Sequence, residues 1–567
     1  MNVPNALKPS IPIDFPSSYF SISTIILLPL GNTAVILLTM LDQLQSPLFR
    51  LPRELRDSIY EHYAHDNNGV FYDYASDKLR YETQEKHQEM TALTRCCKQA
   101  AEEMKDAAMR ANTLTFFPVR SDQDCISVKD VDSKAGRFER LIQSARLMKM
   151  HMLHFVAKGE CVTPEMVDQV ATRFPNIACY YRKAYSAIKA GDELYQGTGI
   201  HPFDYSWRWQ TSATFCDALH YTLELASSHP KFDQLIAESI VSPLSIRGMM
   251  PPFKPGCQNA FLTWKPDRAL ISTETDLTLE SFLADPLPRD TDTYLAWTEP
   301  VVPLAWYFSA TTVAVDYLKR LPQSTRLRIR LPVIIRENKL TVAYPESHVR
   351  SLESYLCENK NLRIDLRVGC WTNLTHPFWL HSPFDTQHGN RDFIMKLNLI
   401  RPFADFLDKV LSTFDRIPHP EALNIHIEGH QDESIIAWET FKHAASLQEA
   451  MLESDYIQRD EDVQLSELYD PLYWGLPMSE TTLKDRFQLP HHLPDSFYAV
   501  VRQITEGSGF IHFDGDASAP WDARSMMEAR KYWTPQQFLD EWDAEIFSGF
   551  VSQPPGGIAA FKRMYKL

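Results

Sequence analysis

The sequence is poor in the features that mark catalytic and metal sites. It has 19 glycines among 567 residues, so glycine-rich loops that could hold phosphate groups are scarce. Its nine cysteines include no pair with C-x-x-C spacing, which removes the common zinc and dithiol patterns. It contains no P-loop, no H-E-x-x-H helix and no G-x-S-x-G turn. We therefore assign no catalytic residues, no metal site and no cofactor from the sequence, and leave enzymatic activity open.

Charge and thiol content narrow the class further. The chain has 73 acidic and 57 basic side chains, and its net charge of -16 opposes nucleic-acid binding, because phosphate backbones repel an acidic surface. Nine scattered cysteines, an odd number, are typical of unpaired thiols in a reducing compartment. We expect a cytoplasmic or nuclear protein that does not bind nucleic acid, or a membrane-anchored one if its N-terminal segment spans a bilayer.

That N-terminal segment is an uncharged, apolar run at residues 15–41. It is long enough to cross a bilayer, which needs ~20 apolar residues. A Pro-Leu-Gly-Asn sequence at 29–32 favours a kink or a break in any helix there. Three interpretations stay open: a membrane anchor, a leader that is dispensable because translation starts at Met40, and a segment packed in a core.

Two amphipathic helices are expected after this run. Leucine and isoleucine residues recur every four positions from Leu51 to Ile59, which is one face of a helix, and Pro52 suits its first turn. The second helix is expected at Thr91–Ala111, and a short strand follows at residues 114–117. The segment Asp66–Met90 between the helices is polar with several aromatic residues.

Three stretches of this region carry a family resemblance: F-R-L-P-R-E-L-R-D-S-I-Y-E-H-Y (Phe49–Tyr63), A-L-T-R-C-C-K-Q-A-A-E-E-M (Ala92–Met104) and N-T-L-T-F (Asn112–Phe116). Together they resemble a group of uncharacterised proteins from filamentous fungi whose N-terminal segment is similar to an F-box. Weaker similarity to the same group lies at Arg336–His348 and Glu358–Val368.

The resemblance implies that the first helix docks a protein partner through an apolar face. An SCF-type adaptor is the partner that an F-box-like segment implies. The implied partner-binding face comprises Leu48, Leu51, Pro52, Leu55 and Ile59.

Helix and strand patterns alternate beyond residue 120. A helix is expected at Arg137–Gln143, a strand at Leu147–Phe155 with three methionines on one face, and a helix capped by Thr163 that ends near Phe174. These units look like the irregular leucine-rich αβ repeats found behind many F-boxes. Later strands are expected at Leu327–Leu331, Leu362–Val368 and Leu423–Ile427, with spacings too uneven for a fixed-period solenoid.

We therefore predict an α+β fold. It starts with F-box-like helices, continues through irregular helix–strand (leucine-rich-like) units and ends in a mainly helical C-terminal part. The expected divisions are an apolar leader at 1–45, an F-box-like segment at 46–120, an αβ region at 121–242, a proline-rich junction at 243–303 and an α+β region at 304–567. C-terminal helices are expected at Pro402–Phe414, Trp438–Leu452 and Pro535–Ile546.

Two charged patterns are candidate sites on the later strands. Arg326, Arg328 and Arg330 alternate with apolar residues, so on a strand they form a basic stripe, either a solvated sheet face or a docking site for an acidic partner. His426-Ile427-Glu428-Gly429-His430 places two imidazoles and a carboxylate on one face of the next strand, which is compatible with a metal, although an exposed strand end explains it more simply.

The function expected from these patterns is that of an F-box-like protein-interaction or scaffold protein. Recruitment of substrates to a ubiquitin ligase is one form of that role. Two alternatives stay open: an enzyme with a site in the Trp- and His-rich C-terminal half, and a membrane-tethered structural protein that uses residues 15–41.

Overall fold

The computed structural model divides into two compact units, residues 1–56 and 57–567, and each is described by itself. The described residues are 46–82, 92–120, 134–174, 181–182, 185–186, 188–189, 213–241, 257–265, 271, 278–282, 307–339, 341–342, 348–374, 393–414, 416–417, 419–429, 431–453, 493–494, 496–515, 521–547 and 550–552. The apolar run at 15–41 lies outside them. Among the helices that are described, none has both the length and the apolarity that crossing a membrane requires.

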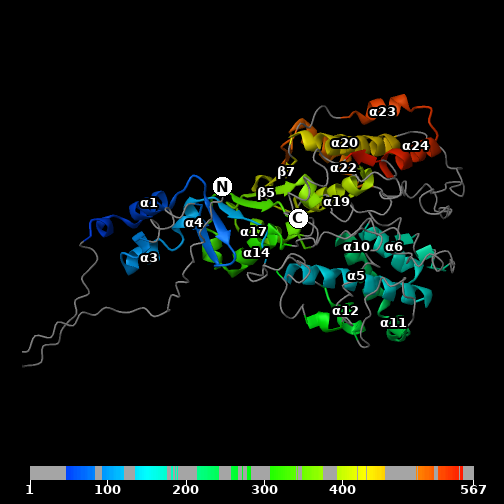
Figure 1. Cartoon of the computed structure of the whole chain (residues 1–567), viewed down its shortest axis with the longest axis horizontal. Helices are drawn as coiled ribbons and strands as arrows, with labels where there is room; N and C mark the ends of the chain where they lie inside the picture. Colours follow the sequence, from blue (N-terminus) through cyan, green and yellow to red (C-terminus); the bar gives the residue numbers. More distant parts are fainter. Residues whose placement is uncertain are drawn as a thin grey trace, which may run out of the picture. The chain divides into compact units, whose positions relative to one another are not determined.

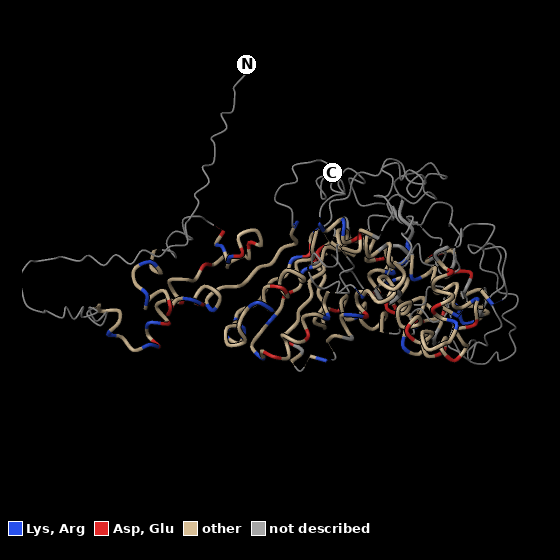
Figure 2. The backbone as a smooth tube through the Cα atoms, turned by 90° about the horizontal axis from the view of Figure 1, so that it is seen from below, with Lys and Arg blue, Asp and Glu red and all other residues tan. Residues whose placement is uncertain are grey.

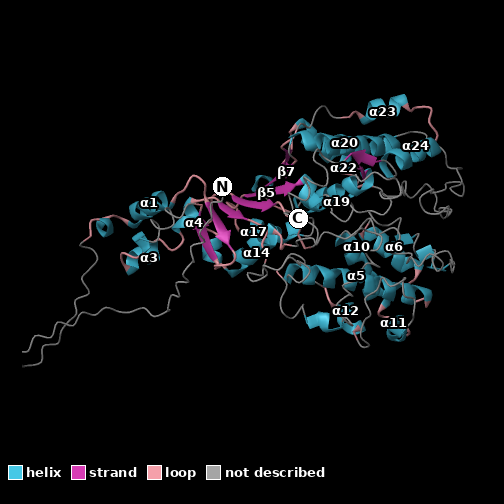
Figure 3. Ribbon diagram, in the orientation of Figure 1, coloured by secondary structure: helices cyan, strands magenta, loops and turns pink. Residues whose placement is uncertain are grey.

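A seven-stranded sheet organises residues 57–567, with the strand order β2-β1-β3-β4-β5-β7-β8 (Figure 3). β1 and β2 form an antiparallel hairpin, and every other neighbouring pair in this sheet is parallel. From β3 onward the strands of the sheet follow one another in chain order. Their bounds are β1 Val70–Asp73, β2 Lys78–Tyr81, β3 Leu114–Phe116, β4 Val333–Glu337, β5 Ile364–Gly369, β7 Leu423–Glu428 and β8 Ile511–Phe513; β6 (Phe393–Met395) pairs separately with β9 (Phe550–Ser552).

Alternation along the central strands decides which face of the sheet packs. In β4, β5 and β7 every second residue is buried, starting from the first. The buried residues stand in register across the sheet, as in the row Ile335, Leu366, Ile425 and Ile511. Burying each such side chain contributes ~1.5–3 kcal/mol, and a slip of one residue would expose the whole set, so this pattern fixes the register.

A layer of helices covers the apolar face. α14 (Ala310–Arg320) packs on β3 and β4, and α22 (Phe497–Glu506) packs on β8. The short 3-10 helix η7 (Arg350–Leu352), which leads into α17 (Glu353–Glu358), contacts both α14 and α19 (Lys396–Phe414). α19 in turn contacts α20 (Gln431–Glu453) and α22, so the helices form a continuous layer.

Glu337, the last residue of β4, is the charged residue in the buried row and is 2% exposed. Its carboxylate accepts hydrogen bonds from the Ser309 hydroxyl, the backbone N–H groups of Ala310 and Thr311, and the Thr311 hydroxyl. Together with the N-cap Ser309 it satisfies the first N–H groups of α14 and complements the positive end of the helix dipole. A strand-end carboxylate thus fixes the start of α14 to the sheet.

A group of helices is inserted between β3 and α14, and we call it the helical lobe (the described residues of 134–282). α5 (Lys134–Lys158) contacts α10 (Ala213–Ala226), α11 (Phe232–Val241) and α12 (Gln258–Thr263), and α6 (Pro164–Arg173) contacts α10 (Figure 1). The predicted start of α6 is confirmed, since the Thr163 hydroxyl accepts a hydrogen bond from the Met166 N–H.

The predicted strand at Leu147–Phe155 is wrong, because these residues belong to α5. Met148, Met150 and Met152 alternate in the sequence, yet all are buried, and so are Lys149 and His151 between them. A helix buried on all sides carries no single apolar stripe, so its sequence can imitate the two-residue period of a strand.

The single helix predicted at Thr91–Ala111 is also wrong. α3 (Lys98–Glu103) and α4 (Ala107–Ala111) are separate short helices, and the Cys97 sulfur caps α3 by accepting from the Ala100 N–H. The polar segment between the predicted helices contains the β1–β2 hairpin. Because β3 pairs with β4, the sheet runs across the division expected at residue 120.

The mixed α+β character is confirmed, as are several predicted elements. β5, β7, α19 and α20 overlap the segments expected at those positions. The C-terminal helix is α24 (Pro535–Glu541), which continues as the π-helical turn η13 (Trp542–Phe547). The remaining elements are η2 Leu48–Arg50, α1 Arg53–Ala64, α15 Gln323–Arg326, η5 Thr278–Phe282, η8 Cys370–Leu374, η10 Pro420–Ala422 and α23 Ala523–Ala529.

Candidate functional site

The face of the sheet opposite the helices is half-buried and largely polar. Its central row contains Arg336 in β4, Arg367 in β5, His426 in β7 and His512 in β8, which are register partners from one strand to the next. We call these four residues the Arg–His row. Neighbouring strands lie ~4.8 Å apart, so the row extends for ~14 Å across the sheet.

Carboxylates and an amide border the row. Arg367 Nη1 lies 3.6 Å from Glu428 Oε1, which is an ion-pair distance rather than a good hydrogen bond. The Asn424 amide donates a 3.2 Å hydrogen bond to the Asp365 carboxylate. Acidic and basic residues are interspersed along the whole described chain, so finding both on this sheet face is not unusual (Figure 2).

His426 is uncharged near neutral pH. Its pKa is lowered mainly by burial; His512 and Arg367 lower it further, while Asp365 and Glu428 oppose the shift. The His426 and His512 rings lie 5.2 Å apart with 30° between their planes. A neutral imidazole here can donate or accept a hydrogen bond without adding positive charge.

The two arginines of the row are incompletely satisfied. Within the described residues, the Nε atoms of both Arg336 and Arg367 are buried and have no hydrogen-bond partner. A planar guanidinium binds carboxylate or phosphate oxygens in pairs, so this part of the face can accept an anion.

The implied partner-binding face on the first helix is largely exposed. Leu55 is 52% and Ile59 42% exposed, Pro52 is exposed, and Leu48 and Leu51 are half-buried. α1 buries Tyr60 and Ala64 instead, on another side of the helix. The four-residue period correctly located the helix, but Tyr60 and Ala64 show the same period and could not be ranked by sequence.

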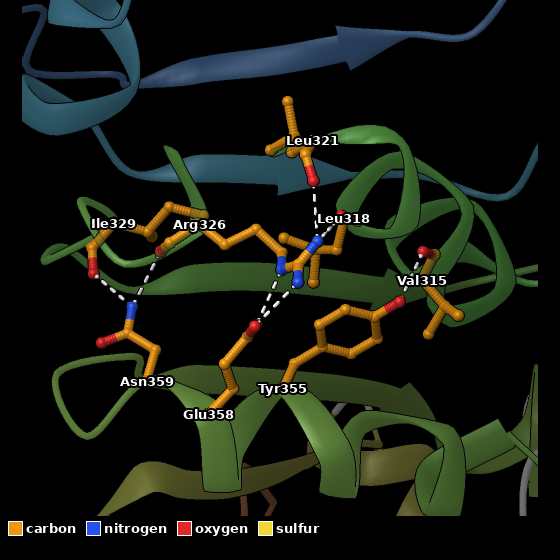
Figure 4. A network of polar contacts seen from close by, with 8 residues as sticks. All are labelled: Val315, Leu318, Leu321, Arg326, Ile329, Tyr355, Glu358 and Asn359. Atoms are coloured by element: carbon orange, nitrogen blue, oxygen red, sulfur yellow. Dashed lines mark hydrogen bonds and ion pairs between the residues drawn. The ribbon is translucent and has the colours of Figure 1, made fainter. Parts of the chain in front are cut away.

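The predicted basic stripe does not exist as a strand face, because residues 327–328 form a turn, residues 329–332 are irregular, and the strand begins at Val333. Arg326 ends α15 and makes a bidentate ion pair with Glu358, with two N–O distances of 2.7 Å (Figure 4). It also donates to the carbonyls of Leu318 and Leu321 at the end of α14, which is a structural role.

The other two members of that stripe have different surroundings. Arg328 lies 3.2 Å from the Asp106 carboxylate, and Arg330 is exposed in the irregular segment. Asn359 closes the turn by donating to the carbonyls of Arg326 and Ile329 (Figure 4). The alternation of Arg326, Arg328 and Arg330 is visible in the sequence, but the three side chains have different surroundings because they do not lie on a strand.

The metal pattern considered at His426–His430 has no geometric support here. His426 and Glu428 share the polar face of β7, whereas His430 lies outside the described residues. No group of three or more histidine, cysteine or acidic residues with metal-binding geometry occurs in the described parts of the chain.

Lys149 and His220, two buried polar residues of the helical lobe, are paired with each other and with neighbouring groups. Lys149 Nζ lies 2.7 Å from the Trp264 carbonyl and 3.1 Å from His220 Nδ1, and His220 Nε2 lies 2.9 Å from Glu224. The pKa of His220 is lowered by burial and then by Lys149. Lys149 therefore donates to the neutral ring, which in turn donates to Glu224.

A cysteine–histidine contact in the same lobe does not make a nucleophile. The Cys161 sulfur lies 3.1 Å from His229 Nδ1, but Cys161 is fully buried and burial raises the pKa of its thiol. A reactive cysteine needs a lowered pKa and access to solvent. The pair is a packing contact.

Comparison with protein-family models, with curated proteins and with solved structures found no match for this chain.

Proposed function

We propose that this protein is an F-box-like interaction or scaffold protein, in which α1 docks an SCF-type adaptor and the αβ region holds a second partner. Substrate recruitment to a ubiquitin ligase is the specific form of this role. We also propose that the chain is F-box-like and leucine-rich-like and that it is related to the fungal proteins it resembles.

The exposure of Leu55 and Ile59 is the observation that carries the proposal. Leu55 is 52% and Ile59 42% exposed, and the two residues are four positions apart in the α1 sequence, the spacing that helix-docking partners use. Single exposed aliphatic residues are common on protein surfaces, but an aligned pair on one helix face is more specific. Tyr60 and Ala64 are the buried residues of α1, and Leu55 and Ile59 are exposed.

The parallel sheet supports the second half of the proposal. The strands of this sheet from β3 onward follow chain order, and the helices α14 and α22 pack on its apolar face, whereas the side chains of the opposite face are half-buried among the described residues. In leucine-rich-like units the uncovered strand face is the surface that repeated polar residues can present to a partner. The Arg–His row lies on that surface.

Affinity purification of the full chain from cells, with quantification of a cullin-RING adaptor, tests the proposal. We expect the wild-type chain to recover the adaptor and a Leu55→Glu/Ile59→Glu variant to lose at least nine-tenths of it, because two carboxylates would have to be buried in the interface. Leu327→Glu is the matched control, since Leu327 is 43% exposed outside α1. Equal recovery by all three chains, or no adaptor with any of them, rejects the proposal.

A further inference from the structure

Two arginines directly opposite each other make the β4 end of the Arg–His row unusual. Arg336 and Arg367 are register partners on adjacent parallel strands, ~4.8 Å apart along the hydrogen-bonding direction. Like charges opposite each other on one sheet face oppose pairing of the strands. Nearby carboxylates do not resolve this, because Glu428 approaches only Arg367, and at 3.6 Å.

The unpaired charge is concentrated at Arg336. No ion pair or hydrogen bond joins its side chain to any described residue, and its buried Nε has no acceptor. The Nε of Arg367 is equally unsatisfied. Two partly buried arginines, Arg326 and Arg530, hold the carboxylates of Glu358 and Glu541, whereas Arg146 in α5 resembles Arg336 in having buried nitrogens without a partner among the described residues.

We infer that the Arg–His row binds an extended, acidic segment of a protein partner, with one partner carboxylate held between Arg336 and Arg367. An anion in that position removes the repulsion and satisfies both Nε–H groups. His426 and His512 extend the polar row toward β8, where they offer hydrogen bonds to the backbone or side chains of the same segment.

The flanking charges decide between a protein segment and a nucleic acid. Asp365 and Glu428 stand on β5 and β7 beside the row, and the exposed Asp514 follows β8. A continuous phosphate backbone would meet these carboxylates as well as the arginines, and repulsion would cancel much of the attraction. A peptide can place a carboxylate at the arginine pair and neutral residues beside the acids.

The size of the row separates a chain segment from a small anion. One phosphate or acetate can engage the arginine pair but cannot reach His512, three strands from Arg336. An extended peptide rises ~3.3 Å per residue, so about four residues cover the ~14 Å row. The inference rests on the proposed function in one respect: it assigns the segment to a recruited protein. The Arg–His row itself is made of other residues than the α1 face.

Fluorescence anisotropy on the full chain tests the inference. The probe is a rhodamine-labelled peptide with glutamate at alternate positions, and the same peptide with glutamine in place of glutamate is its control. We expect the glutamate peptide alone to bind, at least tenfold more weakly to Arg336→Gln and to Arg367→Gln. Binding to Arg330→Gln should match the wild type, because Arg330 is exposed in an irregular segment away from the row.

Thermal unfolding separates a binding role from a structural one. Arg336→Gln should unfold at the same or a higher temperature than the wild type, because the substitution relieves repulsion in the free protein. A lowered midpoint, undiminished peptide binding by both variants, or no binding of the glutamate peptide would overturn the inference. Displacement of the peptide by equimolar inorganic phosphate, or equal binding of a single-stranded oligonucleotide, would overturn its assignment to a protein segment.

Adaptor recovery distinguishes the failure of this inference from the failure of the proposed function. Arg336→Gln should still recover the adaptor through α1. Loss of peptide binding with intact adaptor recovery leaves the proposed function standing. Intact peptide binding without any adaptor rejects the adaptor role alone.

Discussion

The helical lobe and the polar sheet face use the same residue types in opposite ways. In the lobe, Lys149 and His220 are buried and bonded to each other and to neighbouring acceptors. On the sheet, Arg336 and His426 are only half-buried, and the Arg336 guanidinium has no partner among the described residues. A buried charge without a partner destabilises the fold. A half-buried charge costs less, so it can remain unpaired until a ligand binds.

The comparison shows that residue identity alone does not mark a site in this chain. Histidine and basic residues occur in both regions, and the alternating pattern pointed to Arg326, Arg328 and Arg330 rather than to the pair on the sheet. What separates Lys149 and His220 from Arg336 is the satisfaction of their hydrogen-bonding groups, a criterion that also marks Arg146 of the lobe as unsatisfied.

The largest effect is expected from Lys149. Lys149→Met leaves the Trp264 carbonyl and the His220 ring without their shared donor, so the free energy of unfolding should fall by ~3–5 kcal/mol. Lys265→Met removes a more exposed lysine, which pairs with Glu224, and should cost less than ~1 kcal/mol. Urea denaturation measures both; equal losses would show that burial does not govern the contribution of these amines.

Acid should destabilise the lobe through His154, which is half-buried in α5. Burial, followed by His151 and Lys158, lowers the pKa of His154 to about 4. Its contribution to stability is therefore complete above the unfolded pKa of ~6.5 and is lost progressively as the pH falls toward 4, up to ~3 kcal/mol. The measurement is the free energy of unfolding as a function of pH for the wild type and for His154→Gln. The free energy should fall less steeply with acid in the variant. Parallel curves would exclude His154 as a source of acid lability.

Arg326 tests a partnered arginine within the sheet region. Arg326→Met breaks the pair with Glu358 and frees two carbonyls at the end of α14, so we expect a loss of ~2 kcal/mol. Arg330→Met, four residues away and exposed, should change stability by less than ~0.5 kcal/mol. A similar loss in the two variants, measured by chemical denaturation, would contradict the assignment of Arg326 as a helix-end clamp.

The smallest effect is expected on the exposed side of α1. Leu55→Ala should alter the free energy of unfolding by less than ~0.5 kcal/mol, because the side chain is half exposed. Tyr60→Ala, on the buried side of the helix, should cost ~3 kcal/mol, since it removes an aromatic ring and the hydrogen bond to Glu103. Thermal unfolding compares them. A large loss for Leu55→Ala would mean that the face serves the fold.

Local patterns in the sequence predicted the elements whose residues need no distant partner to be recognised. The alternation in Leu423–Ile427 predicts β7, and the Thr163-Pro164 pair predicts the start of α6. The four-residue period predicts the helix α1, although not which of its sides is exposed. The same alternation in R-I-D-L-R-V around Arg367 was a usable signal for the polar sheet face, because it places Asp365 and Arg367 on one side of a strand.

Only the tertiary structure decided the rest. Whether Met148, Met150 and Met152 belong to a strand or a helix depends on the helices that surround α5, and these are distant in sequence. The hairpin β1–β2 gains its place by pairing with β3, and β3 by pairing with β4, more than 200 residues later. The opposition of Arg336 and Arg367 is likewise a matter of register. Sequence fixes which face each side chain takes within its own element, but only pairing between elements determines which charges meet and which are left without a partner.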